Sequence, residues 1–256
     1  MSGSATLTLT ALAGVPNVTD GDNLVAIILS ALEASALTLQ TGDVVVLAQK
    51  IVSKSEGRTV DLATIEPSDR ARELAAVSDK DPRVVELILR ESTEVLRSRP
   101  GAIIVAHRLG FVCANAGIDQ SNVGAGGDDR VLLLPKDPDA SSAAIRRELK
   151  RRTGADVAVL VIDSIGRAWR NGTIGTAIGL SGLPGLLDLR TRPDLFGRPL
   201  QTSELGLADE LASAASLIMG QAAEGRPIVL ARGVPYDRRE GTMRELIRPK
   251  EMDLFR

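Results

Sequence analysis

The chain has 256 residues, of which 44% are hydrophobic and 25% charged, and its formal net charge is −2. This near-neutral balance argues against a protein whose main task is to coat nucleic acid or an acidic membrane surface. One cysteine, Cys113, and one histidine, His107, are too few for a disulfide framework or for a zinc site with several soft ligands. Because there is neither a secretory signal nor a run of about 20 apolar residues, we expect a cytoplasmic protein without membrane spans.

The N-terminal part of the chain predicts strands and helices in alternation. Polar and apolar residues alternate at 6–12, which predicts a strand, and apolar residues recur at helical spacing at 23–37, which predicts an amphipathic helix. β-branched residues at 44–47 predict a buried strand. Asp81 and Pro82 are typical of a helix start, and the apolar stripe of that helix runs on to Val95 and Leu96.

The rest of the chain continues the alternation of strands and helices. Strands at 102–106 and 111–114, on either side of a turn at 108–110, predict a hairpin. Further elements follow in chain order: a short strand at 131–134, a helix at 139–152, a very apolar strand at 156–162 that we expect to be central, a helix at 208–219, a strand at 228–231 and a helical turn at 243–247. The stretch 167–199 has no clear periodicity, and long irregular stretches in compact domains are often functional. The pattern predicts a mixed α and β fold, without the regularity of a doubly wound sheet. We expect a single domain, 1–256, which could consist of two closely packed subdomains.

The first candidate site follows the strand at 111–114. Asp119, Ser121 and Asn122 offer the oxygen ligands that hard cations such as Mg²⁺ prefer, and the glycines after them let the backbone approach a ligand. A polar turn that closes a hairpin explains the same residues equally well.

The second candidate is Asp163, which we expect at the end of the apolar strand, followed by Ser164. An isolated aspartate at such a place is more often a turn or cap residue than a metal ligand. Arg167, Trp169 and Arg170 come next in the chain and strengthen the functional interpretation, because paired arginine donors bind phosphate or carboxylate.

Two further stretches carry weaker signals. Lys50, Lys54 and Arg58 follow a buried strand and could contact phosphate, although a solvated strand end is the simpler explanation. The glycines of 219–226 could simply end a helix. The chain has no P-loop, no dinucleotide-binding glycine motif and no nucleophile elbow, and we expect His107 to be structural.

Taken together, five stretches resemble the coenzyme F420:L-glutamate ligase family, also called F420-0 gamma-glutamyl ligase, in its stand-alone form. They are spread over nearly the whole chain in family order. They are GVP at 14–16, KIVSKSEGR at 50–58, GFVCANAGIDQSNV at 110–123, IDSIGRAWRNG at 162–172 and ADELASAASLIMGQAAEGRP at 208–227.

The resemblance implies an α+β, family-specific ligase fold with mixed, largely antiparallel sheets and an intertwined homodimer. It implies a GTP-dependent ligase that joins L-glutamate to the phospholactyl-type tail of coenzyme F420-0, with later glutamates γ-linked. The route expected is an acyl phosphate, with release of GDP and phosphate. Two divalent ions, Mg²⁺ or Mn²⁺, are implied as cofactors, and K⁺ is compatible with the family.

The resemblance also assigns site residues, position by position. Asp119 and Asp163 would hold the first metal, and Ser164 and Gln221 would serve the second. Lys54 and Arg170 are the candidates for neutralising charge during catalysis. Contacts to GTP are expected from Val15, Pro16, Asn17, Val18, Gln49, Lys54, Asn122, Met219, Gly220, Gln221, Ala222, Ala223, Glu224, Gly225 and Arg226.

Two positions depart from the family pattern. Ser164 stands where threonine is frequent, which keeps the hydroxyl, and Gln49 stands where a small hydroxyl residue is common, which puts that GTP contact in question. The alternatives are a related metal-dependent ligase with another acceptor and a non-catalytic protein that binds deazaflavin or nucleotide.

Overall fold

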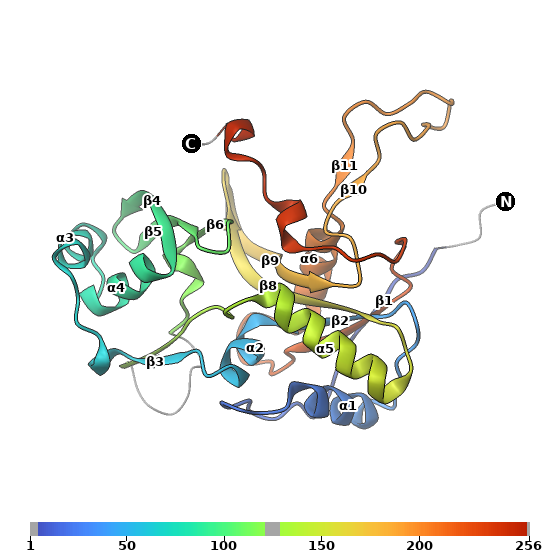
Figure 1. Ribbon diagram of the computed structural model, residues 1–256, viewed down its shortest axis with the longest axis horizontal. Coiled ribbons are helices and arrows are strands. Elements are labelled where there is room, and N and C mark those ends of the chain that lie inside the picture. The colour runs from blue at the N-terminus through green and yellow to red at the C-terminus, as the bar shows by residue number, and fades with distance from the viewer. Residues whose placement is uncertain (1–4, 121–128, 255–256) are drawn as a thin grey trace.

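The computed structural model describes residues 5–120 and 129–254 (Figure 1). The main sheet has five strands in the order β1-β12-β2-β8-β9. Their bounds are Thr8–Ala11 for β1, Ile228–Arg232 for β12, Val44–Ala48 for β2, Ala158–Arg167 for β8 and Arg170–Ser181 for β9. Strands β2 and β8 are parallel, whereas the other neighbouring pairs are antiparallel. The expected α+β fold with mixed, largely antiparallel sheets is therefore confirmed.

Helices cover both faces of this sheet, as Figure 1 shows. The alternation of side chains along β8 explains why: Val159 and Val161 belong to the core on one face, and Leu160 and Ile162 belong to the core on the other. The first core is completed by α1 (Leu24–Ala34), α2 (Gln49–Ser55) and α5 (Pro138–Thr153), and the second by α6 (Leu207–Met219).

Glycines in β9 allow two of these helices to approach the sheet closely. A Cβ atom on Gly175 would lie 2.3 Å from the carbonyl oxygen of Ala212 in α6. A Cβ atom on Gly179 would lie 2.3 Å from Cβ of Pro138, the first residue of α5. Any larger side chain at either position would force the helix away from the strand, so these glycines are packing residues.

A smaller lobe lies beside the main sheet, on the left in Figure 1. It contains α3 (Asp69–Ser78), α4 (Pro82–Arg90), a three-stranded sheet of β4 (Ser92–Arg99), β5 (Ala102–His107) and β6 (Val112–Ala114), and the ladder of β3 (Thr59–Asp61) with β7 (Arg130–Leu132). It has its own apolar core, yet Phe111 and Ile165 pack against both this core and that of the main sheet. The single-domain prediction stays a prediction.

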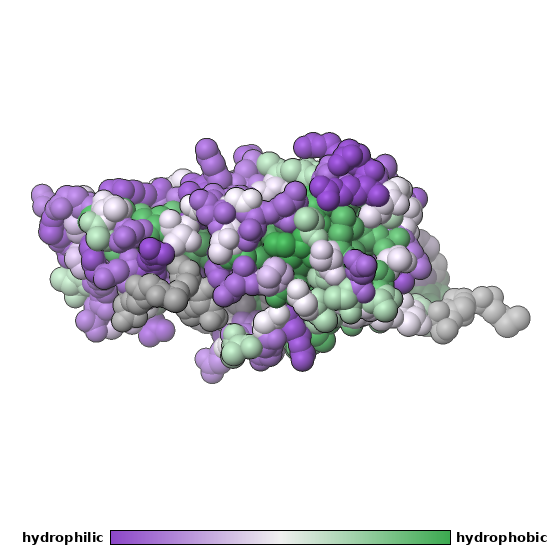
Figure 2. All heavy atoms as spheres, turned by 90° about the horizontal axis from the view of Figure 1, so that it is seen from below, coloured by the Kyte–Doolittle hydropathy of each residue, from purple (hydrophilic) through white to green (hydrophobic). Residues whose placement is uncertain are grey.

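A long arm leaves the main body between β10 (Leu187–Asp188) and β11 (Glu204–Leu205), at the upper right of Figure 1. Its most distal apolar residues, Leu195 and Phe196, are 99% and 85% exposed. The opposite side of the molecule, seen in Figure 2, mixes hydrophilic and hydrophobic residues, and hydrophilic ones predominate over the lobe with α3 and α4.

Most expected elements are present, but three expectations about helices and strands were wrong. The helix that begins at Pro82 ends at Arg90, and Val95 and Leu96 lie in β4. The strand expected at 156–162 begins at Ala158 and continues to Arg167, and it is fourth in the sheet, so β2 is the central strand. Within the irregular stretch 167–199 lies the long strand β9, whose glycines replace the side chains that would have revealed its periodicity.

Within the described part of the chain, no helix combines the length and the apolar character needed to cross a bilayer.

Candidate functional site

Three of the predicted ligand segments meet at one edge of the main sheet. Strands β1 and β2 are both antiparallel to β12, and β2 is parallel to β8, so the carboxyl ends of β1, β2 and β8 lie at the edge where β12 begins. Residues 15–18 follow β1, Gln49 follows β2, and residues 219–226 precede β12. Backbone hydrogen bonds tie the edge together, from Leu12 N to Ile228 O and from Ala48 N to Pro227 O, each 2.9 Å. Carboxyl ends of parallel strands are a common place for ligands.

The two predicted metal-binding aspartates also lie together. Asp119 follows a 3-10 turn, Asn115–Gly117, and its backbone pairs with that of Leu132. Asp163 follows the last buried residue of β8, Ile162, and is part of the strand, so the expectation that it stands at the strand end was wrong.

The charge of one carboxyl group acts on the other. Burial, and then the negative charge of Asp119, raises the pKa of Asp163 to about 6. Burial also raises the pKa of Asp119, although Lys50 and Gln49 partly offset this effect. Two carboxylates that repel each other in a partly buried place favour a cation between them.

Asp119 is held by two residues of α2. The Nε2 atom of Gln49 donates a hydrogen bond of 2.8 Å to Asp119 Oδ2, and Lys50 Nζ lies 3.5 Å from the same oxygen. Gln49 is only 1% exposed, and its Oε1 accepts a hydrogen bond from Ser53. The side chain of Gln49 is therefore committed to orienting Asp119.

The second predicted pair lies on the other face of β8. Neighbouring residues of a strand point to opposite faces, so Ser164 points to the side covered by α6 while Asp163 points to the side covered by β6. The Ser164 hydroxyl donates to Gln221 Oε1 at 2.6 Å, and Gln221 Nε2 donates to the Ser216 hydroxyl at 2.9 Å. The structure thus brings Ser164 and Gln221 together, as predicted.

The segment 219–226 begins with the last residue of α6, Met219, and continues as irregular chain. Gly220 has a positive φ of 77°, and a Cβ atom there would meet the Glu224 side chain. The Glu224 carboxylate accepts a hydrogen bond from Ala222 N, which lowers its pKa. Arg226 is exposed and could reach an anionic ligand at this edge.

The remaining predicted residues are placed less uniformly. Lys54 lies in the last turn of α2, and burial, followed by the charge of Lys50, lowers its pKa. Arg170 lies at the start of β9 opposite Arg167, which is four residues beyond Asp163 on β8, roughly 13 Å along the strand. Asn122, together with Ser121, lies outside the described residues.

Cys113 is one residue near the acids that the sequence did not mark as special. It is buried in β6, and burial and the charge of Asp163 raise the pKa of its thiol to about 12. Only its place in the strand before Asp119 could have indicated that it lies near the site. Lys50 was marked by the sequence only as a candidate phosphate contact, and the structure places its ammonium group beside Asp119.

The donors at the two pairs fit hard cations only in part. Asp119 and Asp163 supply two carboxylates, the usual protein contribution to a Mg²⁺ site that is completed by phosphate and water. Ser164 and Gln221 supply neutral oxygens, which would need phosphate oxygens to bind a divalent ion tightly. No group of three or more acidic, histidine or cysteine side chains suited to a metal occurs among the described residues.

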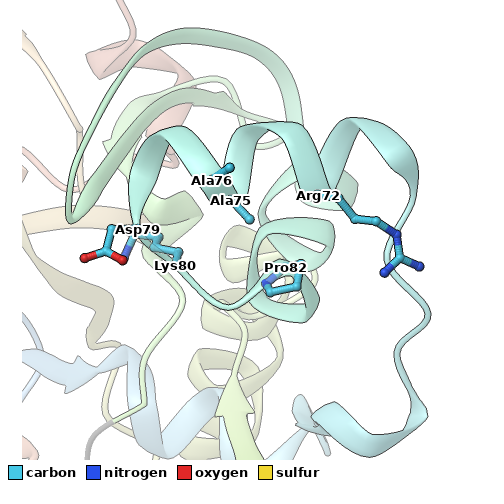
Figure 3. A pocket seen from close by; sticks show the side chains of 6 residues that line it. All are labelled: Arg72, Ala75, Ala76, Asp79, Lys80 and Pro82. Carbon is cyan, nitrogen blue, oxygen red and sulfur yellow. The ribbon is translucent and has the colours of Figure 1, made fainter.

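Two surface hollows lie away from this edge. One, shown in Figure 3, is formed by α3 and the start of α4, with Arg72 directed away from it and Asp79 at its other end. The other is lined by residues of α1, α2 and α5 and by two cap residues, Asn23 before α1 and Glu56 after α2. Neither contains a predicted site residue.

Comparison with known proteins identifies the family of the chain. A family model described as F420-0:Gamma-glutamyl ligase matches residues 14–233. The coenzyme F420:L-glutamate ligase of Methanothermobacter thermautotrophicus is 45% identical over 252 residues, covering 98% of this chain and 99% of that protein. The enzyme of the same description from Methanopyrus kandleri is 45% identical over the full length of both chains, and that from Archaeoglobus fulgidus is 40% identical over 95% of this chain and 94% of its own.

These matches define an enzyme, a ligase that forms carbon–nitrogen bonds. The chain belongs to the F420-0:gamma-glutamyl ligase family, because the family model covers most of its length.

Proposed function

We propose that this protein is a GTP-dependent ligase that attaches L-glutamate to coenzyme F420-0, with later glutamates joined through the γ-carboxylate. The names of its relatives support the acceptor and the amino acid. The observation that carries the proposal is the pairing of Asp119 and Asp163 beside the edge where the predicted nucleotide segments meet.

The reaction would proceed in two steps. An oxygen of the acceptor carboxylate forms a bond to the γ-phosphorus of GTP, and the bond to the departing GDP breaks. The glutamate amine then forms a bond to the acyl carbon, phosphate leaves, and the amine loses a proton. Both steps bring several negative oxygens together, so positioning and electrostatic stabilisation are the main tasks of the protein.

The residues at the edge suit these tasks. We assign the offsetting of phosphate charge to Lys54, in the last turn of α2, and to Arg226, shortly before β12, and Arg170 lies further away at the start of β9. Asp119 and Asp163 would hold one divalent ion, Mg²⁺ or Mn²⁺, and Ser164 with Gln221 would hold a second with the help of phosphate oxygens. When bound, such ions supply positive charge that polarises the phosphoryl group.

We propose a role for Gln49 in addition to the GTP contact expected of it. Its buried amide holds the Asp119 carboxylate, so we assign it to orienting a metal ligand, and its contact with GTP stays a prediction. The predicted contacts of residues 15–18 and Asn122 with GTP, a K⁺ ion and a cytoplasmic location also stay predictions.

We also propose that the protein forms the homodimer expected of its family. The arm between β10 and β11 supports this, because Leu195 and Phe196 at its far end are almost fully exposed. Large exposed apolar side chains on an extended arm are typical of contact with another chain. Sedimentation of the wild-type protein and of Phe196→Ser tests it, and the proposal requires that the substitution weaken the dimer.

The test of function compares Asp163→Asn with a control carboxylate. The control is Asp209→Asn, since Asp209 is also partly buried with a raised pKa, but it caps the Ala177 backbone N–H in β9. Each protein is incubated with GTP, Mn²⁺, L-glutamate and unglutamylated coenzyme, and the products are read by mass spectrometry.

We expect Asp163→Asn to abolish glutamate addition and Asp209→Asn to retain it. Glutamate addition by Asp163→Asn at the wild-type rate would remove the metal assignment. Failure of the wild-type protein to use this acceptor, with activity on a different one, would favour the related-ligase alternative. Absence of any Mn²⁺-dependent GTP binding would favour the non-catalytic alternative.

A further inference from the structure

The tip of the β8–β9 hairpin carries two arginines. Arg167 and Arg170 are directly opposite in the ladder, and like charges in such a pair repel each other. Within the parts of the chain that the structure describes, neither guanidinium group forms a hydrogen bond or ion pair with a carboxylate. Between them, Trp169 is 88% exposed and has a left-handed φ of 63°, which a bulky residue rarely adopts. Strain of this kind is concentrated at functional sites.

Arg167 differs from Arg170 in being partly buried. Exposure alternates along this end of β8, so that Asp163, Ile165 and Arg167 lie on the more buried face while Ser164 and Gly166 are exposed. Ile165 packs against both apolar cores together with Phe111, which precedes β6. The face that carries Arg167 is therefore the one that carries Asp163, beneath the smaller lobe.

One nitrogen of Arg167 has no partner. Its Nη1 atom is buried, and no acceptor among the described residues lies within hydrogen-bonding distance. Buried donors in native proteins are almost always satisfied, and a charged donor is especially costly to leave without an acceptor. A missing partner that carries negative charge accounts for the arrangement.

We propose that Arg167 binds an oxyanion of the substrates that react at Asp119 and Asp163, through a paired guanidinium contact that includes Nη1. The oxyanion is a carboxylate or a phosphodiester, both of which match the planar fork of arginine. This inference rests on the proposed function for the identity of those substrates.

The position of Arg167 favours the acceptor or the amino acid, and not the nucleotide, as the ligand that it binds. The predicted nucleotide segments lie at the ends of β1, β2 and β12, whereas Arg167 lies on β8, roughly 13 Å further along the strand than Asp163. Residues 219–226 are also linked to the opposite face of β8, through the hydrogen bond from Ser164 to Gln221. A substrate that reaches from the acids toward the hairpin tip would meet Arg167, and GTP at the sheet edge would not.

The test measures equilibrium binding, so that it does not depend on turnover. Isothermal calorimetry with L-glutamate, with unglutamylated coenzyme F420-0 and with GTP in the presence of Mn²⁺ is compared for the wild type, Arg167→Gln and Arg167→Lys. Arg147→Gln is the matched control, because Arg147 is an exposed arginine on α5, outside the site. Thermal unfolding checks that each variant is folded.

We expect Arg167→Gln to weaken one of the two oxyanion substrates roughly tenfold to a hundredfold, the effect of losing a charged hydrogen bond. GTP affinity should change less than twofold, and the control should bind all ligands like the wild type. Arg167→Lys, which keeps the charge but not the fork, should give an intermediate loss, and it provides the readout if Arg167→Gln does not fold. The ligand whose binding is weakened shows whether Arg167 binds the glutamate carboxylate or the phosphodiester tail of the coenzyme.

Two results would overturn the assignment: unchanged binding of both oxyanion substrates in Arg167→Gln and Arg167→Lys, or a loss confined to GTP. Failure of the proposed function is a separate result, because it would appear in the wild type as absence of glutamate addition.

Discussion

His107 makes the stability of the fold depend on pH in a way that can be measured. It is 1% exposed at the end of β5, its ring stacks on Phe111 with centroids 5.3 Å apart, and its Nδ1 accepts a hydrogen bond from Leu109 N. Its Nε2 is buried without a hydrogen-bond partner in the described chain.

Burial, and then the charge of Arg108, lowers the pKa of His107 to about 4, with a smaller contribution from Arg58. Glu91 acts in the opposite direction, since its Oε2 lies 3.7 Å from His107 Nε2, but the same oxygen already accepts hydrogen bonds from both arginines. The imidazole is therefore neutral in the folded protein at physiological pH.

The sign of the pH effect follows from the two states of the chain. Above pH 6.5 the imidazole is neutral in both, and the fold has its full stability. As pH falls below 6.5, the unfolded chain takes up a proton before the folded protein does, so the free energy of unfolding decreases. A folded pKa of about 4 against the ordinary 6.5 gives about 3 kcal/mol in total, of which about 2 kcal/mol is lost between pH 7 and pH 5.

Urea unfolding of the wild type and of His107→Gln, at pH 7 and at pH 5, measures this difference. The chain has only one histidine, so no other imidazole contributes. The absolute stability of the variant does not matter, because the comparison uses the change with pH. We expect the wild type to lose about 2 kcal/mol more than the variant between the two pH values. Parallel losses would show that His107 is protonated as easily in the folded protein as in the unfolded chain, and would refute the reasoning.

Two other predictions concern the packing around the site. Gln49→Leu removes the hydrogen bond that orients Asp119, and we expect calorimetry to show that Mn²⁺ binds about tenfold more weakly. Gln40→Leu, at an exposed position, is the control. Equal Mn²⁺ affinity in Gln49→Leu and the wild type would mean that the amide does not orient the ligand. Gly175→Ala places a Cβ against the carbonyl of Ala212 and should destabilise the fold by about 1–3 kcal/mol in urea. Gly166→Ala, which meets nothing within 4 Å, should cost little, and similar losses in both variants would argue against the close packing of α6.

Local patterns were sufficient to predict the elements whose neighbours are close in sequence. The helix after Asp81 begins where its capping aspartate and proline indicate, and the hairpin around Arg108 forms as its turn predicts. The end of that helix was misplaced because Val95 and Leu96 satisfy a helical stripe and a strand equally well, and pairing with β5, a tertiary effect, decides between them.

The candidate site was predictable in its residues but not in its geometry. The family resemblance named Asp119, Asp163, Ser164 and Gln221, and the structure places them as two neighbouring pairs. That the pairs occupy opposite faces of β8 could not be deduced, because the strand was expected to stop before Asp163. The link from Gln49 to Asp119 joins residues 70 positions apart, and no local pattern reports such a contact.

The continuation of β8 beyond its buried part places a constraint on how this chain can change over evolutionary time. Side chains along a strand alternate with a period of two, so one inserted residue before Asp163 would turn every later side chain to the opposite face. Asp163 would then face α6, and Ser164 would turn to the side covered by β6. Substitutions in β8 can be tested by selection one at a time, whereas a change in its length alters every functional position from Asp163 to Arg167 at once. A change of length in the exposed arm between β10 and β11 leaves the register of β8, and with it every position from Asp163 to Arg167, unaltered.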